Sequence, residues 1–158
     1  MSIIFFSFMF IFVMIFLSSN SQSEPLKIKK IDYYGSLEGK KMDVYYNKSK
    51  IPRVLKKTLG AIFGKKFRIA NPNLQYRKTD VASLDLPSRQ MKFLAVVDNY
   101  YLLVFKQGGK AHSTYFVFSE VVNNVVCQIN IFYISNNVES VQDLIQAIES
   151  DKIYPTNW

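Results

Sequence analysis

The fold is decided by residues 91–134, which read MKFLAVVDNYYLLVFKQGGKAHSTYFVFSEVVNNVVCQINIFYI. Aromatic and β-branched residues dominate this stretch, and three pairs of turn-forming residues interrupt it: Asp98-Asn99, Gly108-Gly109 and Asn123-Asn124. Such pairs favour the left-handed backbone of two-residue hairpin turns. The stretch therefore predicts a four-stranded antiparallel meander, with strands over 91–97, 100–106, 111–121 and 125–134.

Two-residue turns at all three pairs would also fix which side chains share a face of the sheet. In this register one face is an apolar core face, which collects Leu94, Val96, Tyr101, Leu103, Phe105, Thr114, Phe116, Phe118, Cys127, Ile129, Ile131 and Tyr133. Cys127 is thus expected to be a buried, inert thiol. The opposite face is too apolar for full exposure, so we expect another element to cover part of it.

Two helices are expected beside the sheet. Apolar residues recur at helical spacing over 51–63, and Gly64 follows as a natural stop. A second helical stripe covers 138–150, where Asn136 and Glu139 resemble a capping box.

The flanking segments complete the expected architecture. Residues 26–34 and 41–46 alternate on either side of a glycine-bounded turn and predict a hairpin, whereas the tail from Asp151, with Pro155, predicts no regular structure. The sequence as a whole predicts an α+β fold, in which an antiparallel sheet is packed by a basic amphipathic helix and a C-terminal helix.

The N-terminus carries a candidate leader. Residues 3–17 are almost wholly apolar, which is shorter than the about 20 residues that span a bilayer and matches the core of a signal peptide. Ser21 and Ser23 satisfy the small-residue rule for cleavage, which divides the chain into a signal peptide, 1–23, and a single α+β domain, 24–158. A basic cluster follows the apolar run, however, and favours an uncleaved anchor instead: Lys27, Lys29 and Lys30.

The composition narrows the function classes. The chain of 158 residues has a formal net charge of +8 and contains one Cys and one His. A single Cys excludes a disulfide framework and any multi-cysteine metal centre, and a single His excludes paired-histidine metal motifs. The sequence therefore predicts no cofactor and no metal site.

No catalytic constellation emerges from the residue pattern. Cys127 and His112 are the obvious nucleophile and base, but the expected register separates them by about eight strand positions, or roughly 26 Å. Residues 107–110 resemble a phosphate loop only in composition, because no helix follows to supply N–H groups. We therefore expect a protein that is not an enzyme, and we assign no catalytic residue.

The basic charge belongs to the first half of the mature chain. Residues 24–78 hold 15 Lys and Arg against 4 acidic residues, whereas residues 79–158 hold 5 against 8. Around the expected helix the cations form a candidate anion-binding patch: Arg53, Lys56, Lys57, Lys65 and Lys66. Three interpretations remain open, namely a solvated face, a helix that lies on an anionic membrane surface, and a site for a polyanion.

These observations predict a small, exported, non-enzymatic binding or accessory protein of the cell envelope, secreted or periplasmic. Its partner would be a membrane surface, an acidic glycan or an acidic protein, and export argues against nucleic acid. The alternative is a membrane protein with an uncleaved N-terminal helix anchor and a soluble α+β domain.

We predict that the leader is cleaved within about two residues of Ser23, because the small-residue rule tolerates short shifts. N-terminal sequencing of the protein from its native host should then find a mature start near Glu24. A mature protein that retains Met1 or Ser2 would contradict the signal peptide and support the anchor.

Overall fold

The computed structural model describes residues 39–64, 66–79, 85–109 and 112–156; the predicted leader and the predicted strand over 26–34 lie outside this part of the chain. None of the helices in the described residues is long and apolar enough to cross a membrane. In chain order the elements are β1 (Asp43–Tyr45), the 3-10 helix η1 (Lys48–Lys50), α1 (Arg53–Ile62), β2 (Arg89–Val97), β3 (Tyr100–Gln107), β4 (Ser113–Val122), β5 (Val125–Ile134), α2 (Val141–Glu149) and β6 (Ile153–Pro155).

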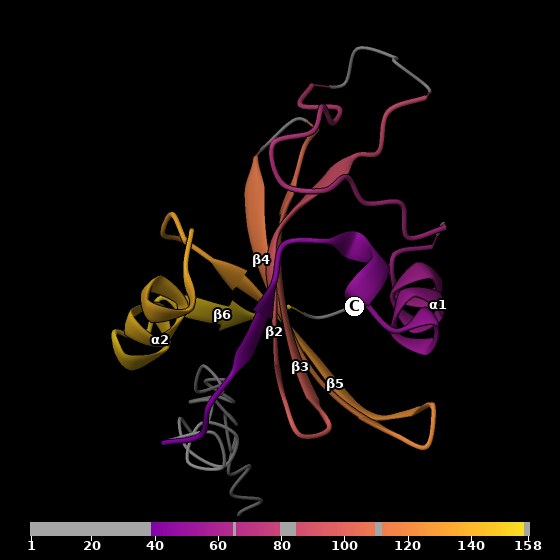
Figure 1. Cartoon of the computed structure of the whole chain (residues 1–158). Coiled ribbons are helices and arrows are strands. Elements are labelled where there is room, and N and C mark those ends of the chain that lie inside the picture. Colours follow the sequence, from indigo (N-terminus) through magenta and orange to yellow (C-terminus); the bar gives the residue numbers. More distant parts are fainter. Residues whose placement is uncertain (1–38, 65, 80–84, 110–111, 157–158) are drawn as a thin grey trace, which may run out of the picture.

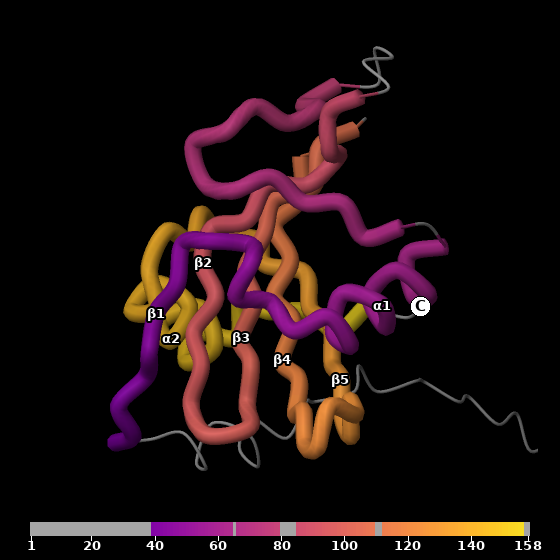
Figure 2. Tube along the Cα trace, turned by 45° about the vertical axis from the view of Figure 1, so that its right-hand side comes forward, coloured from indigo at the N-terminus to yellow at the C-terminus, as the bar shows by residue number. Residues whose placement is uncertain are grey.

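The described strands form an antiparallel sheet in which each strand pairs with its neighbour in sequence, in the order β1 to β6. Figure 1 shows this sheet edge-on, with α1 on one side and α2 on the other. Figure 2 shows β1 to β5 side by side, with α1 in front of them. The predicted α+β class, with an antiparallel sheet and two helices, is confirmed.

Two of the three predicted turns have the expected backbone. Asp98, between β2 and β3, has a φ of 51°, and Asn123 and Asn124, between β4 and β5, have φ values of 50° and 61°. Asn and Asp accept this left-handed conformation because their short side chains bond to the local backbone. These turns connect neighbouring strands without a longer loop.

The third predicted turn, at Gly108-Gly109, is wrong. Gln107 at the end of β3 pairs with Ser113 at the start of β4, so the connection spans residues 108–112. Relative to a two-residue turn, this longer connection shifts the pairing by an odd number of positions. A shift of that kind moves every side chain of β4 to the other face of the sheet.

Both faces of the sheet are buried. The core on the α2 side contains Phe93, Ala95, Val97, Leu102, Val104, Phe116, Phe118, Phe132, Ile134, Val138, Leu144 and Ala147. The core on the α1 side contains Ile51, Leu55, Leu59, Phe67, Ile69, Met91, Leu94, Leu103, Phe105, Val117 and Ile131. Phe116 and Phe118, expected beside Leu103 and Phe105, therefore lie on the opposite face, and Val117 pairs with Leu103 instead.

The prediction of a buried Cys127 is also wrong. Glu120 pairs with Gln128 and Val121 pairs with Val126, so Cys127 is the extra residue of a β-bulge in β5. A bulge interrupts the alternation of side chains, and Val126 packs on the α1-side core in its place. The Cys127 thiol is exposed.

Two further expectations at the C-terminal end are wrong in detail. The capping box of α2 is formed by Ser140 and Asp143, not by Asn136 and Glu139, because each of the first pair bonds to the other's backbone N–H. The tail contains β6, which pairs with the end of β5. Pro155 is tolerated there because it ends a short edge strand.

The segment between α1 and β2 lies against the sheet through backbone bonds. The Ala70 N–H donates to the Arg89 carbonyl at 2.9 Å, and the Met91 N–H donates to the Ala70 carbonyl at 3.0 Å. Further along, the chain passes so close to the β3–β4 connection that a Cβ on Gly108 would lie 2.0 Å from the carbonyl oxygen of Arg77. Only glycine leaves room for this approach.

We predict that Gly108→Ala destabilises the protein by about 1–3 kcal/mol, because the Arg77 backbone must move to admit the methyl group. Gly64→Asn is the control, since Gly64 has a φ of 67° with open space around its Cβ position and Asn accepts that conformation. Urea denaturation followed by circular dichroism measures both. An unchanged midpoint for Gly108→Ala would contradict the close approach.

Candidate functional site

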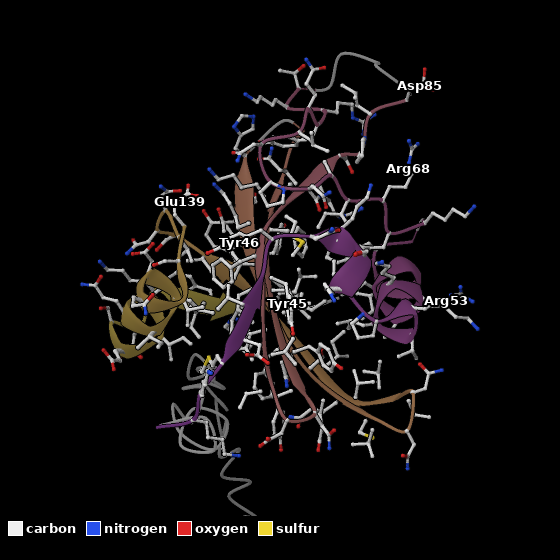
Figure 3. The ribbon with its side chains drawn as sticks, in the orientation of Figure 1. Tyr45, Tyr46, Arg53, Arg68, Asp85 and Glu139 are labelled. Atoms are coloured by element: carbon white, nitrogen blue, oxygen red, sulfur yellow. The ribbon has the colours of Figure 1, made fainter. Side chains whose placement is uncertain are left out.

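The outward side of α1 is a basic surface. Leu55 and Leu59 turn into the core and are fully buried, whereas Arg53 and Lys57 are exposed. Figure 3 shows Arg53 on the side of α1 that faces away from the sheet. We call this surface the basic face, and its residues are Lys48, Lys50, Arg53, Lys56, Lys57 and Lys66. Lys65 of the predicted patch lies outside the described residues.

The two lysines of η1 were not part of the predicted patch. η1 is fixed in front of α1, because the Lys48 N–H donates to Asn71 Oδ1 at 2.7 Å. The Lys50 ammonium lies 5.4 Å from the centre of the Tyr45 ring, a favourable cation–π contact. The sequence signal for these two lysines was Asn47, whose side chain caps η1. The cap places the basic residues of η1 one turn before α1.

The cations of the basic face repel one another. Burial lowers the pKa of Lys56, and the positive charges of Lys48 and Arg53 lower it further. Within the described residues, no carboxylate forms an ion pair with these groups, and the ion pairs that do form involve Lys40, Lys92 and Lys106. The positive potential of the basic face is therefore not neutralised by neighbouring acids in this part of the chain.

Arg89 places a further cation beneath the C-terminal end of α1. Its guanidinium carbon lies 4.5 Å from the centre of the Phe63 ring and 5.0 Å from that of Phe67, and its Nε donates to Gln107 Oε1 at 3.1 Å. Burial lowers the pKa of Arg89, while the nearby Tyr115 hydroxyl raises it. Nothing in the local sequence marked Arg89, because its partners come from distant elements.

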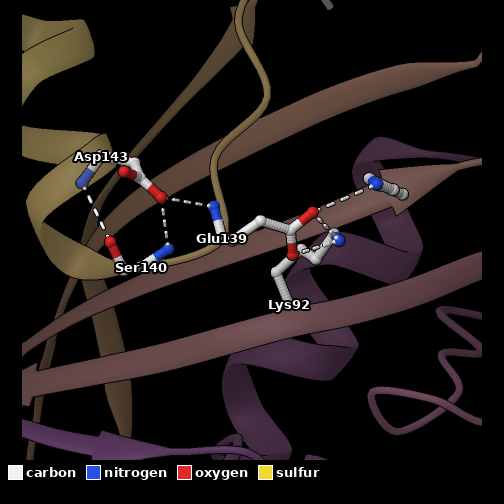
Figure 4. Close-up of polar contacts among 5 residues, drawn as sticks. Lys92, Glu139, Ser140 and Asp143 are labelled. Atoms are coloured by element: carbon white, nitrogen blue, oxygen red, sulfur yellow. Dashed lines mark hydrogen bonds and ion pairs between the residues drawn. The ribbon is translucent and has the colours of Figure 1, made fainter.

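On the other face of the sheet, a polar cluster connects β2 and β3 to the residues that precede α2 (Figure 4). Lys92 is the extra residue of a bulge in β2, and its Nζ lies 2.5 Å from both carboxylate oxygens of Glu139. Lys106 Nζ lies 3.5 Å from the same carboxylate. The cluster helps to hold the start of α2 against the sheet, and Figure 4 also shows the Ser140–Asp143 capping box beside it.

An open hollow of about 600 Å³ lies beside this cluster. It is formed where the segment before β2 passes over the ends of β2 and β3, and its lining residues are Asn73, Leu74, Gln75, Tyr76, Lys78, Leu86, Gln90 and Lys106. Two ammonium groups and several amides could bind a small anion there. The sequence did not predict this hollow, since its walls come from segments far apart in the chain.

The residues considered for catalysis lie apart. His112 directly precedes β4, and one of its ring nitrogens lies 2.8 Å from the Lys78 carbonyl oxygen. Cys127 lies near the turn at the opposite end of that strand. Within the described residues, no group of three or more His, Cys, Asp and Glu side chains is arranged to hold a metal ion.

Comparisons with protein-family models, with curated proteins and with solved structures found no match for this chain. The functional argument therefore depends on the geometry and electrostatics of the chain itself.

We predict that Glu139→Gln lowers the melting temperature at neutral pH and that the loss disappears in acid. Burial acts against the charged form, but the hydrogen bond from Lys92 and the charges of Lys92 and Lys106 prevail and lower the pKa of Glu139. A carboxyl group with a lowered folded-state pKa stabilises the protein above its ordinary value of about 4.3, and this contribution is lost as the pH falls through the lowered value.

The measurement is a series of thermal melts from pH 7 down to about pH 2, which brackets the ordinary pKa of a glutamate. Glu149→Gln is the matched control, because Glu149 is exposed near the end of α2. A melting-temperature difference for Glu139→Gln that stays constant over the whole range would contradict the role of its charge.

Proposed function

We propose that this protein is an exported, non-enzymatic accessory protein of the cell envelope, and that its basic face holds an acidic partner. One observation carries the proposal: α1 buries its apolar side chains in the core and directs its cations outward, where none forms an ion pair with a carboxylate of the described residues. A surface of this kind attracts polyanions over distances comparable with the Debye length, about 8 Å at physiological ionic strength.

The burial of α1 favours a polyanion over a membrane as the partner. A helix that lies in a bilayer surface must offer its apolar side to the lipid. Here Leu59 is fully buried, and Ile62 and Phe63 are packed against the same core. The helix can therefore make contact through its charges alone. An acidic glycan or an acidic protein suits such a contact better than a lipid bilayer does.

The scaffold supports this proposal. The meander of β2 to β5 gives α1 a broad apolar surface to pack on, and η1 and the Ala70 bridge attach the segments on either side of α1 to the rest of the fold. The backbone of a firmly packed helix loses little conformational freedom when its surface binds a partner.

The alternative to a cleaved leader is an uncleaved N-terminal anchor. It is supported by the lysines that follow the apolar leader, Lys27, Lys29 and Lys30. An anchor would hold the same domain near a membrane and would leave the proposed role of the basic face unchanged.

We predict that replacing Arg53, Lys57 and Lys66 by Gln weakens binding to polyphosphate and to polygalacturonate about tenfold, because three exposed charges contribute a few tenths to one kcal/mol each. Binding of the unaltered protein should itself weaken steeply as salt is raised toward about 0.15 M. Isothermal titration calorimetry at low and high salt measures both effects. Melting temperatures should barely change, since these side chains are exposed.

A matched control removes the same number of charges elsewhere: Lys40, Lys41 and Lys152 are exposed and lie outside the basic face. Changing them to Gln should leave binding within about twofold of the unaltered protein if the effect is local. Equal losses in the two triple variants would mean that net charge acts alone, and would contradict a localised site. No binding of the unaltered protein at low salt would contradict the proposed function.

A further inference from the structure

A row of aromatic rings crosses the sheet on the α1 side. Phe105, Tyr115, Tyr133 and Tyr154 are successive cross-strand partners on β3, β4, β5 and β6. Their ring centres are 5.5, 6.4 and 6.3 Å apart along the row. Because direct cross-strand partners point to the same face of a sheet, the four rings form one continuous strip.

The strip runs from the core to the surface. Phe105 is fully buried, Tyr133 is 37% exposed and Tyr154 is 49% exposed. Tyr133 and Tyr154 lie side by side with their planes tilted by 35°, and together they present an aromatic surface at the β6 edge.

The inner end of the strip packs against the residue that directly follows α1. The Phe63 ring, directly after α1, lies 6.2 Å from the Tyr115 ring, and the Arg89 guanidinium lies over Phe63. Lys66 follows three residues after Phe63 and is exposed. The aromatic surface and part of the basic face are thus connected through one set of packed rings.

We propose that Tyr133 and Tyr154 form a stacking platform for the sugar rings of an acidic glycan, whose anionic groups contact the basic face. A tyrosine ring offers an apolar face to the C–H side of a sugar, and its hydroxyl can bond to the sugar hydroxyls. Cations at the inner end of the strip then select sugars that carry carboxylate or sulfate groups. This inference rests on the proposed function and names the partner class. It favours a glycan over a nucleic acid because the proposed export brings the domain to the cell envelope.

The test separates ring stacking from charge. Polygalacturonate carries sugar rings and carboxylates, whereas polyphosphate carries charge without rings. We expect the double variant Tyr133→Leu and Tyr154→Leu to lose about tenfold or more in affinity for polygalacturonate, because two aromatic contacts are removed. Its affinity for polyphosphate should stay within about twofold, since no charge changes.

Two controls keep the result interpretable. Tyr46→Leu changes another exposed tyrosine, 58% exposed and outside the strip, and should leave both affinities unchanged. Tyr154→Leu alone alters only the short edge strand, so it tests the platform if the double variant melts at a lower temperature. It should still weaken polygalacturonate binding severalfold.

Each outcome has a distinct meaning. A double variant that binds polygalacturonate as well as the unaltered protein does would overturn the platform while leaving the proposed function intact. Binding of neither polyanion by the unaltered protein would overturn the proposed function and the platform together. A tighter complex with single-stranded poly(dT), lost in the double variant while polygalacturonate binding persists, would overturn the glycan assignment in favour of base stacking.

Discussion

The central strands are apolar on both faces, and neither face can be left in water. Phe93 and Leu94 are consecutive in β2, belong to the cores on opposite sides of the sheet and are both fully buried. The sheet therefore requires two covers. α2 packs on one face with Leu144 and Ala147, and α1 packs on the other with Leu55 and Leu59. At about 1.5–3 kcal/mol for each buried side chain of this size, the covers contribute substantially to stability.

This requirement also decides what the surface can do. Because α1 must direct its apolar stripe into the sheet, its cations are left on the outside. There, partial burial lowers the pKa of Lys56, and the charges of Lys48 and Arg53 lower it further. On the same side of the sheet, Tyr133 of β5 and Tyr154 of β6 remain partly exposed. A structural need to bury one sheet face thus leaves a basic surface and an aromatic surface on the same side of the sheet.

The sequence predicted the element types well and the faces less well. Helical spacing in α1 and the turn residues Asp98 and Asn123-Asn124 are local signals. They were sufficient for the fold class and for the outward position of Arg53 and Lys57, but not for the lysines of η1. The alternation of apolar and polar residues along the strands does not reveal the length of the β3–β4 connection or the bulge at Cys127. Each reverses the register once, so the two errors cancel at Ile131, which was placed correctly, but not at Phe116. Arg89, the hollow and the tyrosine strip depend on pairing between distant segments, which a residue pattern does not reveal.

The inward packing of α1 is the central claim, and cysteine labelling tests it most directly. With Cys127 replaced by Ser, a single cysteine is introduced either at Leu59, which is fully buried, or at Lys57, which is exposed. Reaction with a maleimide reagent in the native protein should be fast for Lys57→Cys and strongly protected for Leu59→Cys, with protection lost in denaturant. Equal, rapid labelling at both positions under native conditions would show that α1 does not cover the sheet, and would contradict the account.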